Sequence, residues 1–230
     1  MYFQHSAEMR AEFPDLVAGA LRVEGVTAGA DVSAAVARLT GAAAGRLAGR
    51  AESELPEIQA WRRAFAQLGY KPTQYRCAAE ALLRRFRKDG SLPRLHPLID
   101  LCNAASLAFA IPVAVFDQDR LAGGIEVRRA AGTEDYLTFG GETEHPAPGE
   151  VIFADEAGRA HARRWTNRQS AWSGVTGQTS AALIVAEALH PSAAADVAGL
   201  AETLRAELDA AWPGPAKPVI LTADAPRLGF

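Results

Sequence analysis

Apolar residues in the first half of the chain recur mostly at the three- and four-residue spacing that places them on one side of a helix. This spacing predicts four helices, over residues 31–50, 55–68, 73–88 and 98–110. Gly69 and Gly90 follow two of them as helix-ending residues, and Pro97 suits the first turn of the fourth. An apolar run at residues 16–26 precedes these helices and predicts a strand.

The apolar spacing changes after Pro112, where short runs separated by Gly, Pro and Asp are typical of strands and turns. Five strands are predicted, at residues 112–116, 124–128, 135–139, 150–154 and 160–165. An apolar helix is predicted at residues 179–189 and an amphipathic helix at 192–212, and the Pro-rich residues 213–218 predict a stiff linker before a short apolar tail. Helices, then strands, then helices favour an α+β fold in which helices flank a mixed or antiparallel sheet.

The composition supports a folded core and excludes several classes of protein. Apolar residues make up 49% of the 230 residues, and the net charge of −3 gives no global attraction to nucleic acid, so an RNA contact has to come from a local patch. Cys77 and Cys102 form no disulfide or zinc-ligand pattern, and the histidines lack zinc-ligand spacing, so we expect no metal and no cofactor. No signal peptide or run of about eighteen apolar residues occurs, so we expect a cytoplasmic protein without a membrane span.

The clearest local charge signal is the basic segment at residues 71–96. Its basic residues outnumber the acidic Glu80 and Asp89, and they are Lys71, Arg76, Arg84, Arg85, Arg87, Lys88 and Arg94. On a helix Arg84, Arg87 and Lys88 share one face. Clustered guanidinium groups suit phosphate oxygens, so this face and Arg94 are candidates for tRNA contact. The alternative is a solvated helix face that only keeps the protein soluble.

Two further segments carry residue types that suit chemistry. Residues 163–172 interleave tryptophans with arginines, and the candidates for nucleic-acid contact there are Arg163, Arg164, Trp165 and Arg168. The alternative is the end of a strand whose alternate residues enter the core. Residues 140–146 combine Glu142, Glu144 and His145, a set that suits general acid–base work or forms a polar hairpin loop.

Several short motifs together resemble a known family. They are Pro-Leu-Ile-Asp-Leu-Cys-Asn at residues 97–103, Ile-Pro-Val-Ala-Val-Phe-Asp at 111–117 and Gly-Gly-Ile-Glu-Val-Arg at 123–128. In this order and spacing they resemble the B3/B4 editing domain of the bacterial phenylalanyl-tRNA synthetase beta subunit. The resemblance covers about residues 71–191. It implies that domain's fold, with an activity that hydrolyses the ester of a wrongly charged tRNA.

The resemblance also implies a pocket between the helix that carries Asn103 and the loop at residues 170–176. Asn103 matches the family's pocket asparagine, Cys102 replaces its threonine, and Ala114 stands where the family has a histidine. Ala171 stands where the synthetases carry a glutamate. Because that histidine and glutamate read the tyrosine hydroxyl and position water, alanine at both positions implies a different substrate, or binding without hydrolysis.

Other polar residues are expected around this pocket from their positions alone. They are Ser170, Thr176, Glu142, Arg164 and Thr179. No catalytic residue is assigned, because an aminoacyl ester is already activated and a positioned water with backbone amides as oxyanion donors suffices to hydrolyse it.

Three functions fit these observations. The first is a stand-alone deacylase that edits mischarged tRNA in trans, with Arg84, Arg87, Lys88 and Arg94 contacting the acceptor arm and the aminoacyl moiety in the pocket. The second is a non-catalytic binding module for an amino acid or related small molecule, and the third is an interaction protein that has lost the site. A concave, partly polar pocket at Asn103 with a basic rim favours the first, a closed pocket the second and a filled pocket the third.

The resemblance divides the chain into three parts. Residues 1–70 are expected to form an extension packed on the core, residues 71–191 the editing-like core, and residues 192–230 a C-terminal helix with a Pro-rich tail. We expect one continuous structural unit, because the only linker-like run before residue 213 is short. The segment Tyr2-Phe3-Gln4 resembles the remnant of a protease site in an expression tag or is native, and we assign it no function.

Overall fold

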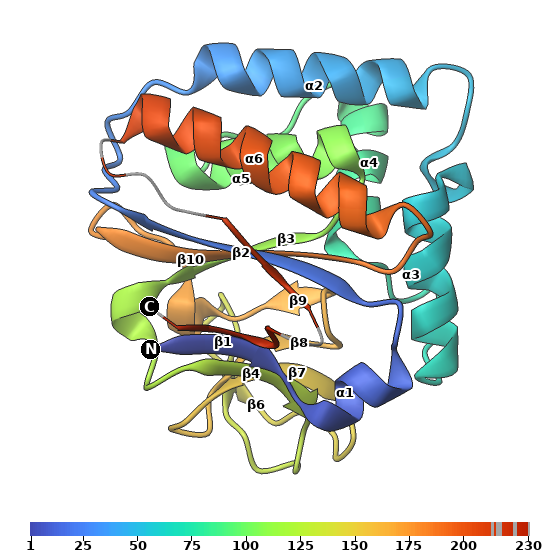
Figure 1. The fold of residues 1–230 in the computed structure, drawn as a ribbon, viewed down its shortest axis with the longest axis vertical. Coiled ribbons are helices and arrows are strands. Elements are labelled where there is room, and N and C mark those ends of the chain that lie inside the picture. Colours follow the sequence, from blue (N-terminus) through green and yellow to red (C-terminus); the bar gives the residue numbers. More distant parts are fainter. Residues whose placement is uncertain (213, 215–217, 223–224, 230) are drawn as a thin grey trace.

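The computed structural model describes residues 1–212, 214, 218–222 and 225–229, which form three stacked layers. The helices of the first layer are α2 (Ser33–Leu47), α5 (Pro97–Phe109) and α6 (Ala193–Ala211). Figure 1 shows them above a four-stranded sheet, with a six-stranded sheet below it. The predicted α+β class, with helices flanking mixed and antiparallel sheets, is confirmed. The predicted stiff linker lies outside the described residues except for Gly214 and Pro218.

The four-stranded sheet is antiparallel throughout and forms the middle layer. Its strands, in spatial order, are β11 (Val219–Leu221), β2 (Val17–Glu24), β10 (Ala181–Ala188) and β3 (Val113–Asp117). In the register of the sheet Val185 of β10 lies opposite Ala114 of β3, and Val185 also lies opposite Ala20 of β2.

The six-stranded sheet is mixed, because β1 pairs in parallel with β4, whereas β1 with β12 and β4 with β7 pair antiparallel. Its strands, in spatial order, are β12 (Arg227–Gly229), β1 (Tyr2–His5), β4 (Ile125–Arg129), β7 (Val151–Asp155), β8 (Ala160–Arg163) and β9 (Arg168–Gln169). A separate short hairpin joins β5 (Tyr136–Leu137) to β6 (Thr143–Glu144).

Three further helices and three short helical turns complete the described part of the chain. They are α1 (Ala7–Glu12), α3 (Pro56–Gln67), α4 (Ala78–Asp89) and the short turns Glu52–Glu54, Gln118–Arg120 and Ala171–Ser173. Ser6 caps α1 by accepting a hydrogen bond from Met9, Pro56 opens α3, and His96 caps α5. Gly90 ends α4 with the left-handed backbone (φ 73°) that glycine adopts without strain.

Two apolar cores lie on opposite sides of the four-stranded sheet. Alternate residues of β10 divide between them: Leu183 and Val185 enter the core between the two sheets, and Ile184 and Ala186 enter the core under the helices. Each fully buried Leu, Ile or Val stabilises the fold by roughly 1.5–3 kcal/mol. The sheet is therefore the common wall of both cores, and side chains from its two faces belong to different environments.

Two predictions of local structure were wrong, and one segment without an expected role forms a strand. Residues 179–189 are not a helix, because residues 181–188 form β10, a strand with every residue buried. Coverage of both faces removes the polar–apolar alternation that marks a half-exposed strand. The helix predicted at residue 73 starts at Ala78. Residues 2–5, given no role, form β1 inside the six-stranded sheet, where Phe3 is buried.

Candidate functional site

A small pocket of about 60 Å³ lies between the two sheets, and we call it the inter-sheet pocket. Its apolar wall includes Ala114 of β3, Val185 of β10 and Phe153 of β7. Its rim is polar and comes from residues 166–169, between β8 and the end of β9. Glu187 of β10 adds a carboxylate that is only 2% exposed. An apolar pocket with a few convergent polar groups is the usual form of a small-molecule site.

Glu187 is held by two buried partners. His5 Nε2 lies 2.6 Å from Glu187 Oε1, and Trp165 Nε1 donates to the same oxygen at 3.0 Å. All three side chains are buried, so the hydrogen bonds replace the water that the carboxylate loses. Glu187 lies two residues beyond Val185 on β10 and so on the same face, the face that meets Ala114. This arrangement couples a carboxylate to an imidazole at the wall of a pocket.

The rim of the pocket is shaped by an unusual turn after β8. Arg164 and Trp165 both have left-handed backbones, with φ of 46° and 58°. Trp165 N donates to Val151 O at 2.7 Å, and its indole packs edge-on against Trp61 with ring centroids 4.9 Å apart. Burial of the Trp165 side chain, which points inward, offsets the conformational cost of these two residues with left-handed backbones. Arg164 points outward over the ring of Tyr75, 4.7 Å from its centroid.

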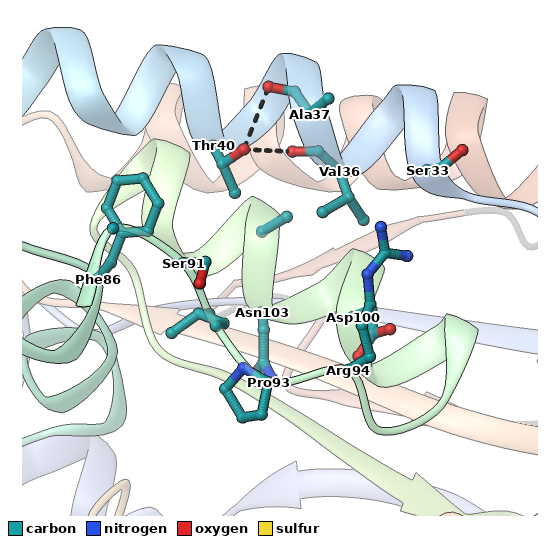
Figure 2. A pocket seen from close by; sticks show the side chains of 13 residues that line it. Ser33, Val36, Ala37, Thr40, Phe86, Ser91, Pro93, Arg94, Asp100 and Asn103 are labelled. Atoms are coloured by element: carbon teal, nitrogen blue, oxygen red, sulfur yellow. Dashed lines mark hydrogen bonds between the residues drawn. The ribbon is translucent and has the colours of Figure 1, made fainter.

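A second, larger pocket of about 210 Å³ lies on the helical side of the four-stranded sheet, and we call it the helix-side pocket. Figure 2 shows it between α2, α5 and the segment after α4, with Asn103, Arg94 and Phe86 among its lining residues. Asp100 accepts a hydrogen bond from Leu95 N (2.9 Å), and Thr40 donates to its own helix. The pocket at Asn103 is thus concave, partly polar and basic at its rim.

Some of the residues predicted to bind substrate or tRNA line these two pockets. Asn103 and Arg94 line the helix-side pocket, whereas Ala114, Trp165 and Arg168 line the inter-sheet pocket. Asn103 and Ala114, which the resemblance placed in one pocket, therefore line two different pockets. The physical reason is that the side chain of Ala114 and the helix that carries Asn103 lie on opposite faces of the same sheet.

The other residues predicted to bind substrate line neither pocket. Cys102 is buried in the helical core. Ser170 is buried and donates to Leu137 O at 2.8 Å. Ala171 begins a short turn, Thr176 lies in the following loop, and Glu142 is exposed in the hairpin between β5 and β6.

Two of the four residues in the segment 163–172 that were candidates for tRNA contact are buried in the core, as the alternative interpretation expected. Arg163 is buried and bound to Glu150 by two hydrogen bonds (2.8 and 2.9 Å), and hydrogen bonding to Glu150 raises the pKa of Arg163. Trp165 is fully buried. Neither side chain is free to meet RNA, so these two predictions of tRNA contact are wrong. Arg164 and Arg168 keep exposed surface.

The basic face of α4 is exposed but partly neutralised. Arg84 and Arg87 both approach Glu52, at 3.9 and 3.0 Å. Lys88 and Arg94 are exposed, and among the described residues no ion pair within 4.0 Å involves either. Because the walls of the helix-side pocket include Phe86 and Gly90, the basic end of α4 borders that pocket.

A serine, a histidine and an aspartate form a hydrogen-bonded chain elsewhere between the sheets. Ser173 Oγ lies 2.8 Å from His161 Nδ1, and His161 Nε2 lies 3.0 Å from Asp155 Oδ2. Burial raises the pKa of Asp155, but hydrogen bonds from His161 and from backbone amides outweigh it and leave that pKa below its usual value. Ser173 and His161 are 0% exposed and, unlike Glu187, line neither of the two pockets, so we assign this chain a structural role.

The residues that sequence analysis missed are Glu187 and His5. Glu187 was placed in a predicted helix and His5 beside a segment without a role. One signal was available: Glu187 is the single charged residue in the apolar run at residues 181–188. A lone carboxylate in such a run is expensive to bury, and it points to a partnered or functional site.

No described helix is long and apolar enough to cross a membrane.

The sequence of this chain is similar to that of a known protein family. The sequence model of the family described as B3/4 domain matches residues 60–205. The phenylalanine–tRNA ligase beta subunit of Cereibacter sphaeroides is 32% identical over 76 residues, 33% of this chain and 9% of that protein. The same subunit of Thiobacillus denitrificans is 35% identical over 77 residues, 34% and 10% of the two chains.

These relatives are much longer than the aligned region, which amounts to about a tenth of their length. Among solved structures, an N-terminal fragment of the phenylalanyl-tRNA synthetase beta subunit from Pyrococcus horikoshii aligns with 94% of this chain and 49% of that chain. The TM-score of that alignment is 0.48 and the sequence identity is 11%.

Proposed function

Because this chain belongs to the B3/4 domain family, whose sequence model matches residues 60–205, we propose that it hydrolyses an aminoacyl-tRNA ester in the inter-sheet pocket. The observation that carries the proposal is Glu187, a buried carboxylate at the pocket wall with an imidazole partner. The relatives are beta subunits of a tRNA ligase, which supports a substrate attached to tRNA. The aminoacyl group enters the pocket past residues 166–169, and the tRNA stays outside.

Glu187 acts as the general base in this proposal. His5 and Trp165 hold one of its oxygens and so fix the orientation of the carboxylate. A water molecule gives a proton to Glu187 and attacks the carbonyl carbon of the ester. The bond between that carbon and the ribose oxygen breaks, and the proton passes to the ribose oxygen, which leaves as a hydroxyl. His5 is a positioning residue, because it acts through Glu187.

The size of the pocket limits the substrate to a small aminoacyl group. The pocket volume of about 60 Å³ is less than a third of the roughly 210 Å³ of the helix-side pocket. Glycyl, alanyl and seryl groups need the least room among aminoacyl groups, and phenylalanyl and tyrosyl groups need much more. Ala114 offers no hydrogen bond to a substrate hydroxyl, which agrees with a pocket that selects by size rather than by reading tyrosine.

The basic face of α4 is the part of the surface that we propose contacts the tRNA. Ala78, the first residue of α4, lines the inter-sheet pocket. Arg84, Arg87 and Lys88 follow it by six to ten residues, or about 9–15 Å along a helix that rises 1.5 Å per residue. Phosphates of an acceptor arm whose end enters the pocket would fall within this distance.

The proposal is tested with tRNAs charged with glycine, alanine, serine, phenylalanine and tyrosine, each mixed with excess protein while the ester is followed over time. We expect loss well above the spontaneous rate for at least one of the three small amino acids and none for the two aromatic ones. An Asn103→Ala variant, changed only in the helix-side pocket, is expected to keep that rate. No loss on any tRNA would contradict hydrolysis, and loss of only the aromatic esters would contradict selection by size.

A non-catalytic binding module for a free amino acid is the second candidate, and the helix-side pocket favours it. At about 210 Å³ this pocket holds Arg94, which suits a carboxylate, and Asp100, which suits an ammonium group. If this is the function, free amino acids raise the melting temperature of the protein, and Asn103→Ala or Arg94→Ala abolishes the increase. All esters in the panel then decay at the spontaneous rate.

A further inference from the structure

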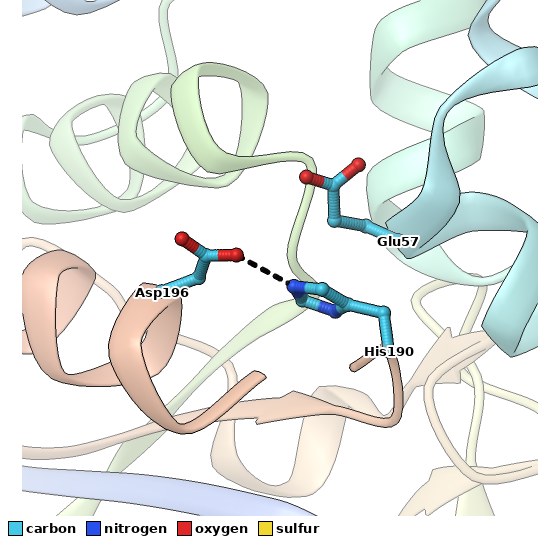
Figure 3. Close-up of side chains that lie close together, drawn as sticks. All are labelled: Glu57, His190 and Asp196. Atoms are coloured by element: carbon cyan, nitrogen blue, oxygen red, sulfur yellow. Dashed lines mark hydrogen bonds and ion pairs between the residues drawn. The ribbon is translucent and has the colours of Figure 1, made fainter. Parts of the chain in front are cut away.

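A histidine and two carboxylates meet at a place that lines neither pocket described above. Figure 3 shows Glu57, His190 and Asp196, which come from three separate segments of the chain. One oxygen or nitrogen atom from each lies within 4.8 Å of the other two. Glu57 stands in the first turn of α3, His190 follows β10, and Asp196 stands in the first turn of α6. From this geometry we propose that the three residues bind one divalent transition-metal ion, with zinc as the best fit.

The hydrogen bonds at this cluster leave ligand capacity unused. Glu57 is 7% exposed, and one of its oxygens accepts from Arg46 at 2.5 Å. Its other oxygen, Oε2, is buried and has no hydrogen-bond partner among the described residues. His190 is 3% exposed, and its Nδ1 is also buried without a partner in the described part of the chain. Unsatisfied buried polar atoms are rare in proteins, and an unfilled ion site is one of their causes.

The surroundings resemble those of metal ligands in general. A carboxylate that binds a metal is usually itself held by hydrogen bonds, which orient it. Arg46 holds Glu57, and Ser192 Oγ donates to Asp196 Oδ2 at 2.6 Å. His190 Nε2 and Asp196 Oδ2 are hydrogen-bonded at 2.8 Å, and a zinc ion would replace this bond with a ligand separation of about 3.3 Å, which follows from bonds of about 2.0 Å in tetrahedral geometry.

Charge and access also permit a cation. The carboxylates of Glu57 and Asp196 outnumber the single guanidinium, that of Arg46, that forms an ion pair with them in the described part of the chain, so the cluster has an excess of negative charge. An imidazole ligand favours zinc and its neighbours over magnesium or calcium, which prefer oxygen alone. The side chain of Asp196 is 38% exposed, which gives an ion a route from solvent. Three protein ligands leave a fourth tetrahedral position open.

The test is calorimetric titration of the chelator-treated protein with zinc chloride, and with magnesium chloride as a comparison. We expect one zinc ion per chain and no saturable magnesium binding. Zinc binding should weaken by more than about tenfold in His190→Ala and in Glu57→Gln, since loss of a ligand costs at least as much as loss of its support. His145→Ala is the matched control, because His145 also lies beside an aspartate, 3.4 Å from Asp135, but on the exposed surface.

Two results would overturn the proposal: the absence of saturable zinc binding, or zinc binding by His190→Ala as tight as that of the unchanged chain. Circular dichroism shows whether each variant is folded. If His190→Ala fails to fold, titration of the unchanged protein with cobalt(II) decides. A visible spectrum of a tetrahedral or five-coordinate cobalt site is expected, and a spectrum of hydrated cobalt would overturn the site.

Discussion

The Nε2 atom of His5 lies 2.6 Å from Oε1 of Glu187, although the two residues are 182 positions apart in the chain. The contact joins β1 of the six-stranded sheet to β10 of the four-stranded sheet. It therefore spans the gap between the two sheets next to the inter-sheet pocket. The N-terminal strand, which the resemblance to a synthetase did not cover, supplies one of the two titratable groups of the proposed site.

Replacing Trp165 with phenylalanine is predicted to destabilise the protein by about 2–4 kcal/mol. The change removes the N–H that Glu187 accepts at 3.0 Å and leaves a gap in the packing against Trp61. Urea unfolding measures the loss. Trp172→Phe is the matched control, because the indole N–H of Trp172 has no hydrogen-bond partner among the described residues and its ring is partly exposed. Equal losses in the two variants would contradict the role given to the bond.

Arg163→Ala is predicted to cost about 3–5 kcal/mol, because it leaves the buried carboxylate of Glu150 without its charged partner and with hydrogen bonds only from the amides of Arg164 and Ala147. Arg168→Ala is predicted to cost less than about 1 kcal/mol, since the Arg168 side chain is 42% exposed and only pairs with Glu144 at 3.3 Å. Thermal or urea unfolding compares them. A small loss for Arg163→Ala would show that its ion pair carries little of the stability.

The low pKa of Glu134 predicts that the stability of the protein depends on pH in the acid range. Burial raises the pKa of Glu134, but hydrogen bonds from the amides of Ala131 and Gly132 and from Arg128 outweigh it and lower the pKa to about 2. A carboxyl group whose pKa is lower in the folded state than in the unfolded state stabilises the protein at pH values above its unfolded-state pKa. This stabilisation is lost as the pH falls toward the folded-state pKa. Glu134→Gln should therefore be less stable by about 2–3 kcal/mol near neutrality.

The difference between Glu134→Gln and the unchanged protein should shrink between about pH 4.5 and pH 2. Urea unfolding at several pH values measures it. Glu142→Gln is the control, because Glu142 is exposed and should give no such change. A difference that stays constant down to about pH 2 would contradict the assignment to Glu134.

The double variant Arg87→Ala, Lys88→Ala is predicted to bind tRNA more weakly and with a smaller dependence on salt. Each lost phosphate contact reduces the slope of log affinity against log salt by about 0.7–0.9. Fluorescence anisotropy at several salt concentrations measures both quantities. Arg205→Ala on α6 serves as the control, because Arg205 pairs within its own helix with Glu202 and Asp209. An affinity equal to that of the unchanged protein would remove α4 from the tRNA surface.

Helices were predictable where a local stop or start signal stands in the sequence. The helix α5 begins at Pro97 and Gly90 caps the end of α4, as these two residues predicted. The strand β10 was not predictable in this way, because its two faces are both buried and its residues show no alternation. The β-branched pair Ile184-Val185 was the one local hint of a strand.

The site was less predictable than the fold, because its members meet only through the topology of the sheets. Nothing near His5 in the sequence points to Glu187, and the pairing of β1 with β4 brings His5 into place. Alternation along a strand also decides which residues share a pocket. Ala114 faces one core and its neighbours Val113 and Val115 face the other, so a motif that contains all three cannot be assigned to one site from spacing alone.

The most direct test of the proposed function compares the unchanged protein with Glu187→Gln in single-turnover hydrolysis of the small aminoacyl-tRNA ester that the protein cleaves best. Glutamine keeps the shape of the side chain but cannot accept a proton. A general base contributes about 10²–10⁴-fold to a rate. We therefore predict a loss of at least about 100-fold in a folded variant with unchanged tRNA affinity. A folded Glu187→Gln that hydrolyses the ester at the rate of the unchanged protein would contradict the assignment of Glu187 and of the inter-sheet pocket as the catalytic site.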